Sequence, residues 1–174
     1  MQLQDKYRIA LLSAYALGLH GFESLLPTPI PWLRLGLANI ITLVTLLLYG
    51  IRSAMMVTLI RVMLASIFTG SFLGPAFILS LGGGVTSTLS MGFVLSLSPR
   101  LFSTIGLSVI GALFHNIVQL FLAYFLFIQR IEAILLIAPL IIFTGILTGT
   151  VNGVISDLLV KNLKNTDVKI QNWI

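Results

Sequence analysis

Apolar residues run almost without interruption through most of this chain, in stretches long enough to cross a lipid bilayer. A spanning helix needs about 20 residues. The runs lack the alternation of apolar and polar positions that marks the strands of a membrane barrel, so we expect helices. Short segments rich in proline, glycine or polar residues divide the runs. The pattern therefore predicts an all-α, polytopic membrane bundle of six transmembrane helices at about 7–25, 35–50, 54–73, 75–96, 102–127 and 133–159.

Three consecutive glycines at 82–84 leave a second division of the chain open. Glycine disfavours a helix interior in water, so dividing 54–96 differently would give a bundle of five spans. In a membrane, glycines can instead let another element approach closely. The six-span division keeps 75–96 as one helix.

The composition supports lipid as the natural solvent of the chain. Hydrophobic residues make up 57% of the 174 residues and charged residues only 9%, with a mean hydropathy of +1.08. A soluble domain carries roughly 25% charged residues. We therefore expect 1–160 to form an integral membrane domain and 161–174 a polar cytoplasmic tail. The absence of cysteine excludes disulfides and thiolate metal sites. The net charge of +5 is spread along the chain, so we expect no nucleic-acid partner.

Lysine and arginine predict the orientation, because cytoplasmic loops of membrane proteins are enriched in these residues. With both termini in the cytoplasm, the inner segments hold many more of them than the outer segments. This bias also favours an even number of spans. The inner set is Lys6, Arg8, Arg52, Arg100, Lys161, Lys164 and Lys169, and the outer set is Arg34 and Arg130.

Arg61 is charged and lies deep inside a predicted span. It follows Arg52 by nine residues, which at 1.5 Å each places it roughly 13 Å into a hydrocarbon core of about 30 Å. A charge at such a depth costs at least about 2.5–3.5 kcal/mol. Two roles remain open for Arg61, a functional or gating one and a purely structural one.

Further polar residues fall at a similar depth, in the outer half of the predicted bundle. His115 and Gln119 are four residues apart and share a helix face. Two interpretations stay open: a pocket that binds a solute, or ordinary hydrogen bonds between helices. Asn152 and Asp157 fall nearer the cytoplasm, where we expect helix-end or partner contacts. The predicted substrate-binding set is Glu23, Arg34, Asn39, Arg61, His115, Asn116 and Gln119.

The segment 26-LPTPIPWLR-34 connects the first two predicted spans and holds three prolines. Proline cannot continue a helix and restricts the residue before it, so we expect a stiff, extended connection. Trp32 suits the lipid–water interface. Such a lid would hold Glu23 and Arg34 near each other at the mouth of a pocket. The alternative is a plain interfacial turn with a surface ion pair of at most about 1 kcal/mol.

Small residues recur every fourth position on the first predicted span, at Ala10, Ala14 and Gly18. Residues four apart lie on one face of a helix, so this spacing predicts a smooth stripe. Such stripes let helices pack closely in lipid. The stripe could serve packing within this chain or docking to another membrane protein.

The segment 23-ESLLPTPIPWLRLGLANIITL-43, together with 114-FHNIVQL-120 and 145-GILTGTVNGVISD-157, resembles the Gx transporter family. Members of that family are often labelled heptaprenyl diphosphate synthase component I. The resemblance covers nearly the whole chain and implies a likeness to the S components of energy-coupling factor (ECF) transporters. Such proteins are six-helix subunits of the bacterial cytoplasmic membrane that bind a vitamin-like solute near the outer face. They dock on a transmembrane coupling protein driven by two ATPases, through an Ala-xxx-Ala stripe that Ala10 and Ala14 match.

The synthase label can be tested against the chemistry of the residues. Prenyl diphosphate synthases hold magnesium with aspartate-rich motifs, because hard cations prefer carboxylates. This chain has five acidic residues, and no two of them are adjacent. A Walker motif GxxxxGK[ST] is also missing, so any ATP hydrolysis would lie on another chain. We therefore expect no enzyme and no cofactor or metal of its own.

The leading hypothesis is a membrane-embedded subunit that binds a small solute for uptake and docks on an ATP-driven module. The rival is a non-catalytic membrane component that accompanies a soluble heptaprenyl diphosphate synthase, with spans that accommodate a lipid tail. A third possibility is a structural scaffold in which the polar residues only join helices.

Overall fold

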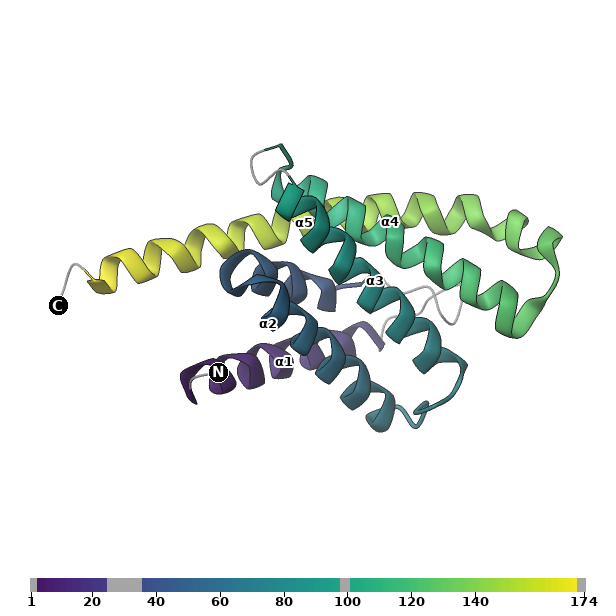
Figure 1. Cartoon of the computed structure of the whole chain (residues 1–174), viewed down its shortest axis with the longest axis horizontal. Helices are drawn as coiled ribbons and strands as arrows, with labels where there is room; N and C mark the ends of the chain where they lie inside the picture. Colours follow the sequence, from purple (N-terminus) through teal and green to yellow (C-terminus); the bar gives the residue numbers. More distant parts are fainter. Residues whose placement is uncertain (1–2, 25–35, 98–100, 172–174) are drawn as a thin grey trace.

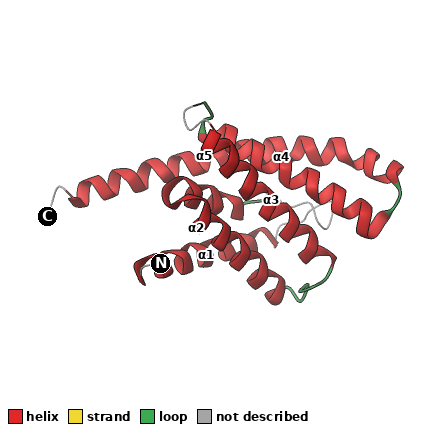
Figure 2. Cartoon of the chain, viewed as in Figure 1, coloured by secondary structure: helices red, strands yellow, loops and turns green. Residues whose placement is uncertain are grey.

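The computed structural model describes residues 3–24, 36–97 and 101–171, and all regular structure in these ranges is helical (Figure 2). Each helix packs against the next one in the chain, and α5 also reaches α2 (Figure 1). A π-helical turn, η1 (Tyr124–Ile128), prolongs α4. The five α-helices are α1 (Leu3–Ser24), α2 (Ala38–Phe68), α3 (Pro75–Leu97), α4 (Thr104–Ala123) and α5 (Ile131–Gln171).

Four helical segments in the described ranges are long and apolar enough to cross a bilayer, so this is a multi-pass membrane protein. Helix α1 is not one of them, because its charged and polar residues make it less apolar than the other four segments. Large apolar side chains point outward from the bundle, as at Phe68 and Leu136, which are 77% and 81% exposed. Lipid is the solvent that suits such a surface. The four segments are Ala38–Phe68, Pro75–Leu97, Thr104–Ile128 and Ile131–Asn165.

The prediction of six separate spans is confirmed in part: the second and third of them correspond to the two halves of the single element α2. The helix breaks at Gly50, whose φ of 79° and ψ of 177° are not helical. Residues with a side chain rarely adopt this backbone conformation, and glycine therefore permits the break. The part at 38–49 is about 18 Å long at 1.5 Å per residue, well short of a core of about 30 Å. The described chain thus has five helices and four candidate spans, and the alternative break at 82–84 does not occur, since α3 is continuous.

Helix α5 continues beyond the boundary predicted at residue 160 and ends only at Gln171. Asp157 accepts a hydrogen bond of 3.0 Å from the Thr104 hydroxyl and pairs with Lys161 at 2.6 Å. Both contacts lie where the helix leaves its most apolar stretch. The helix-end or partner contact predicted for Asp157 stays a prediction, since α5 continues past it to Gln171.

Glycines bring α4 and α5 together backbone against backbone. A Cβ atom added at Gly149 would lie 3.1 Å from the Cα atom of Val109, and one at Gly153 would lie 2.6 Å from the Cα atom of Ile105. Small residues at such an interface let helices approach closely in lipid, where dispersion contacts replace the hydrophobic effect. The 145-GILTGTVNGVISD-157 segment owes its glycine spacing to this contact.

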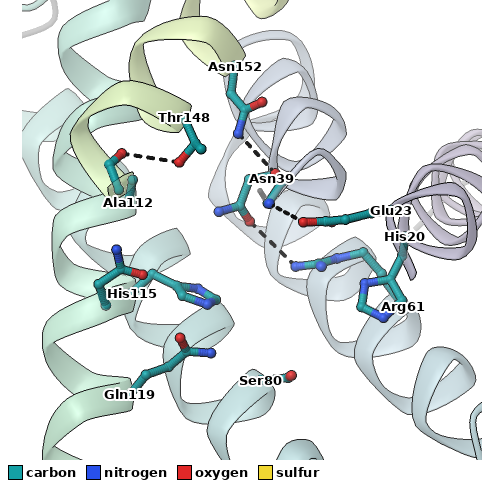
Figure 3. Close-up of a pocket in the computed structure, with 13 residues that line it drawn as sticks. His20, Glu23, Asn39, Arg61, Ser80, Ala112, His115, Gln119, Thr148 and Asn152 are labelled. Atoms are coloured by element: carbon teal, nitrogen blue, oxygen red, sulfur yellow. Dashed lines mark hydrogen bonds between the residues drawn. The ribbon is translucent and has the colours of Figure 1, made fainter. Parts of the chain in front are cut away.

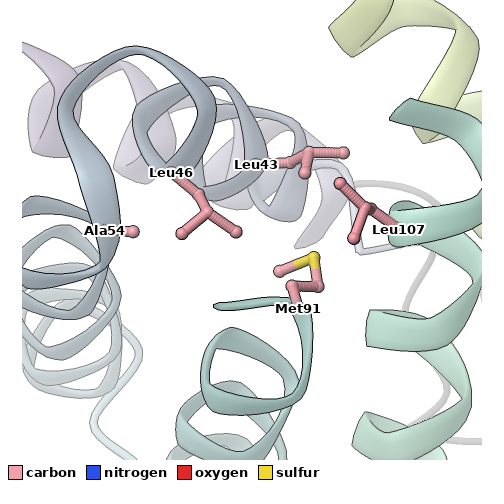
Figure 4. Packing of buried hydrophobic residues seen from close by; sticks show 5 residues of the cluster. All are labelled: Leu43, Leu46, Ala54, Met91 and Leu107. Atoms are coloured by element: carbon pink, nitrogen blue, oxygen red, sulfur yellow. The ribbon is translucent and has the colours of Figure 1, made fainter. Parts of the chain in front are cut away.

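A buried cluster joins the two parts of α2 to α3 and α4 (Figure 4). The break at Gly50 turns the second part of α2 back along the first, which places Ala54 near Leu43 and Leu46. Close by, the hydroxyl of Thr58 lies 3.3 Å from that of Thr42 and 3.0 Å from that of Thr88. These contacts set the register of the helices that carry the polar site described next. The cluster consists of Leu43, Leu46, Ala54, Met91 and Leu107.

Candidate functional site

A polar pocket opens between the helices, and all five of them contribute to its wall (Figure 3). Its empty space is about 600 Å³, including the open side. Ten of the thirteen residues that line it have polar side chains. The remaining three are Gly36, Ala112 and Gly145, so no large apolar side chain faces the space.

One wall of the pocket carries two buried residues of opposite charge. Glu23, at the end of α1, is 2% exposed, and Arg61, in the second part of α2, is 6% exposed. The guanidinium of Arg61 donates to the amide oxygen of Asn39 at 3.5 Å, which joins the two parts of α2. Charged groups are rarely buried without partners, because desolvation is costly. The opposite charges on this wall therefore favour each other's burial.

The peptide of Gly36 is held from two sides. Its N–H donates to a carboxylate oxygen of Glu23 at 2.5 Å, and its carbonyl oxygen accepts from Asn152 on α5 at 3.1 Å. The same oxygen accepts from the backbone N–H of Asn39 at 2.8 Å as α2 begins. Gly36 has a φ of 72°, a left-handed conformation that favours glycine. These contacts explain why a glycine and an asparagine stand at 36 and 39 in the RLGLAN segment.

The facing wall comes from one side of α4, where His115 and Gln119 point toward the pocket (Figure 3). The His115 ring packs on α3 at Gly83, where an added Cβ atom would lie 2.9 Å from the ring. Its Nδ1 atom is buried without a hydrogen-bond partner among the described residues. The hydrogen-bonding capacity of this nitrogen is therefore not used by the described residues.

Asn116 lines the pocket, but its amide is committed to the fold. Its Nδ2 donates to the backbone carbonyl oxygen of Ile141 on α5 at 2.8 Å. Gly145 leaves the room for this amide, since an added Cβ atom there would collide with it. Asn116 thus joins α4 to α5 at the edge of the pocket.

Six of the seven predicted site residues line this pocket, and Arg34 lies outside the described residues. Their role in binding a substrate stays a prediction. Asn152, for which we expected a helix-end or partner contact near the cytoplasm, lines the pocket as well. His20, Ser80 and Thr148 also line it and were missed. Thr148 and Asn152 are spaced four apart on one face of α5, as His115 and Gln119 are on α4, and this spacing could have identified them.

The small-residue stripe of α1 faces away from the bundle. Ala10, Ala14 and Gly18 are all exposed, and a Cβ atom added at Gly18 would meet nothing within 4 Å. The stripe therefore takes no part in packing within the described chain. Docking through it stays a prediction. Within the described ranges, no group of three His, Asp or Glu residues is placed to hold a metal ion.

The bundle and its pocket define the class of protein. The fold is that of an S component: the structure matches the solved S component of a bacterial ECF transporter with a TM-score of 0.73. The two chains are 22% identical over 95% of this chain and 98% of the other. The model of the heptaprenyl diphosphate synthase component I family matches residues 12–159, so the chain belongs to that family. A comparison with curated proteins finds no match.

Proposed function

We propose that this protein is the solute-binding subunit of an uptake system and that the polar pocket is its binding site. The observation that carries the proposal is the lining of the pocket, with ten polar residues and no apolar side chain larger than that of alanine. Ionisable residues inside membrane spans are costly and mark substrate and ion pathways, and Glu23, Arg61 and His115 all line this pocket. A small, hydrogen-bonding solute suits this lining.

The residues of the two walls would contact different groups of the solute. His115 and Gln119 offer an imidazole nitrogen and an amide to the solute, while Arg61 and Glu23 offer opposite charges on the facing wall. Asn116 and Asn152 hold the helices in place through backbone carbonyl oxygens. Arg34 joins this set in the proposal, because it stands two residues before Gly36 in the sequence.

The uptake step itself would depend on a partner. We propose that the exposed stripe of Ala10, Ala14 and Gly18 docks on a transmembrane coupling protein driven by ATPases, as the S-component fold suggests. Both termini would be cytoplasmic. In support, α1 begins and α5 ends toward the same side of the molecule (Figure 1). The excess of basic residues in the segments assigned to that side agrees with this orientation.

The description of the family favours a second candidate, a non-catalytic membrane component that accompanies a soluble heptaprenyl diphosphate synthase. The polar pocket argues against a prenyl chain as its occupant, because no side chain in its lining is both apolar and larger than that of alanine. Copurification with a soluble prenyl synthase, and a change of product length on deletion, would favour this candidate over uptake.

Native mass spectrometry of the protein purified from its own membranes tests the proposal. We expect a bound small solute in the wild type and its loss in Gln119→Ala and Thr148→Val. Thr150→Val is the matched control, because Thr150 lies on the exposed face of the same helix. A wild-type protein without bound solute, with uptake unchanged in both pocket variants, would refute the proposal.

A further inference from the structure

A second, smaller chamber adjoins the polar pocket at the end of the bundle where α2 turns into α3. Its empty space is about 280 Å³, including the open side. The two spaces share His20 of α1 and Ser80 of α3, which therefore stand at the junction between them. We call this space the second chamber; it is lined by His20, Val62, Ala65, Ser66, Thr69, Ser71, Ala76, Phe77 and Ser80.

The chamber differs from the polar pocket in charge. None of the residues that line it is acidic, lysine or arginine. One side is apolar and largely buried, with Val62 5% and Phe77 8% exposed. A charged group moved there from water would lose hydration without gaining an opposite charge. The chamber therefore suits the uncharged part of a molecule.

The other side of the chamber carries hydroxyls that are already used as donors. Ser66 donates to the backbone carbonyl oxygen of Met63 at 2.8 Å, and Thr69 donates to that of Ala65 at 2.9 Å. The hydroxyls of Thr69 and Ser71 lie 2.8 Å apart, so the hydrogen of Ser71 can be shared with Thr69. A hydroxyl has one hydrogen but two lone pairs. What these three side chains still offer is therefore acceptor capacity.

We propose that the solute extends past His20 and Ser80, and that the second chamber binds its uncharged, hydroxyl-bearing arm. The donor hydroxyls of the arm meet the lone pairs of Ser66, Thr69 and Ser71, and its carbon skeleton packs against Val62 and Phe77. The charged or strongly polar end stays in the pocket between Arg61 and His115. This inference rests on the proposed function and adds the chemical class of the solute to it.

The chain has no cysteine of its own, so the reactivity of a single cysteine introduced by substitution reports directly on the chamber. Ser66→Cys places a thiol at a position that is 4% exposed, and Ser96→Cys gives an exposed reference at the far end of α3. The probes are three methanethiosulfonates with arms of similar length: hydroxyethyl, trimethylammonium-ethyl and sulfonatoethyl. Normalised to Ser96→Cys, the hydroxyethyl reagent should modify Ser66→Cys at least about tenfold faster than either charged reagent. Equal normalised rates, or no reaction with any reagent, would overturn the proposal.

A second measurement separates this proposal from the proposed function. Ala76→Leu fills the second chamber at a residue that does not line the polar pocket, and Ser96→Leu is the matched control on the same helix. Solute seen by native mass spectrometry in the wild type and Ser96→Leu, but lost from Ala76→Leu, supports the second chamber. Solute retained by both variants refutes the chamber and leaves the function standing. A wild type without solute counts against the function, and the labelling rates then decide the chamber alone.

Discussion

The side-chain amide of Asn152 donates a hydrogen bond of 3.1 Å to the carbonyl oxygen of Gly36, across 116 positions of sequence. Glu23 accepts from the N–H of the same residue. Gly36, which lies just before α2, is thus joined by hydrogen bonds to Glu23 of α1 and to Asn152 of α5. Glu23 and Asn152, which hold the peptide of Gly36, both line the pocket. The arrangement of the pocket therefore depends on the conformation of Gly36.

Gly36→Ala should weaken solute binding as well as stability. The new Cβ atom has room, since its nearest neighbours would be 3.7 Å away, but the φ of 72° is strained for alanine by about 1–2 kcal/mol. Relief of this strain would turn the peptide away from Glu23 and Asn152. Thermal unfolding and native mass spectrometry should show a lower melting temperature and a lower bound fraction.

Gly70→Ala is the control for backbone strain alone. Gly70 has a φ of 67° and nothing within 4 Å of an added Cβ atom. This variant should lose a similar amount of stability and keep its solute. If the two variants bind equally well, the double tie to Gly36 has no part in shaping the pocket.

Gly83→Ala should disturb the pocket through His115. An added Cβ atom would lie within about 3 Å of three ring atoms, and an imidazole ring cannot bend out of the way. The ring must shift, so we expect affinity for the solute to fall about tenfold or more. The measurement is a titration of the purified protein with the solute identified by mass spectrometry.

A double-mutant cycle checks the cause of that loss. In Gly83→Ala/His115→Ala the clash is gone, so the second substitution should add far less than it does in the wild-type background. Strictly additive losses would mean that Gly83 acts by some route other than the ring.

Thr58→Val should destabilise the fold without changing any atom that lines the pocket. Thr58 is fully buried, and its hydroxyl lies within hydrogen-bond distance of those of Thr42 and Thr88. Loss of these contacts leaves the Thr42 hydroxyl buried in an apolar setting, at a cost of about 1–3 kcal/mol. Thermal unfolding in detergent measures this loss, and Thr150→Val, on an exposed face, should be near neutral. A near-neutral Thr58→Val would contradict a structural role for the threonine contacts.

Hydropathy predicted the helices and most of the pocket, because depth in a span follows from counting residues along a rigid helix. The prediction put Glu23, Asn39 and His115 at one height, and the structure brings them to one pocket. Counting also ended one span at residue 50 and began the next at 54, which is where the backbone of α2 breaks, at Gly50. It did not show that α5 continues to Gln171, well beyond its apolar run, or that Asn152 would line the pocket.

Contacts within the chain between residues far apart in the sequence could not be predicted from sequence patterns either. Three glycines at 82–84 suggested either a broken helix or a close approach, and hydropathy does not distinguish the two. The structure shows a continuous α3 whose middle glycine makes room for His115. This choice depends on α4 lying alongside, which is a tertiary contact.

Ala14→Trp should uncouple the protein from its partner while leaving the binding pocket intact. Ala14 is exposed in the middle of the stripe, so the large side chain meets no part of the described bundle. Melting temperature and bound solute should therefore match the wild type. A partner helix packed closely on the stripe has no room for tryptophan, since small residues at such contacts allow backbones to approach. Copurification of the coupling protein and uptake by whole cells should both be lost.

Leu136→Trp is the matched control for this substitution, because Leu136 is 81% exposed on α5, away from the stripe. It should keep both the partner and uptake. Normal uptake by Ala14→Trp would mean that the small residues of α1 face lipid and that docking uses another surface. Loss of uptake together with loss of bound solute would instead place the effect in the pocket, since α1 also carries His20 and Glu23.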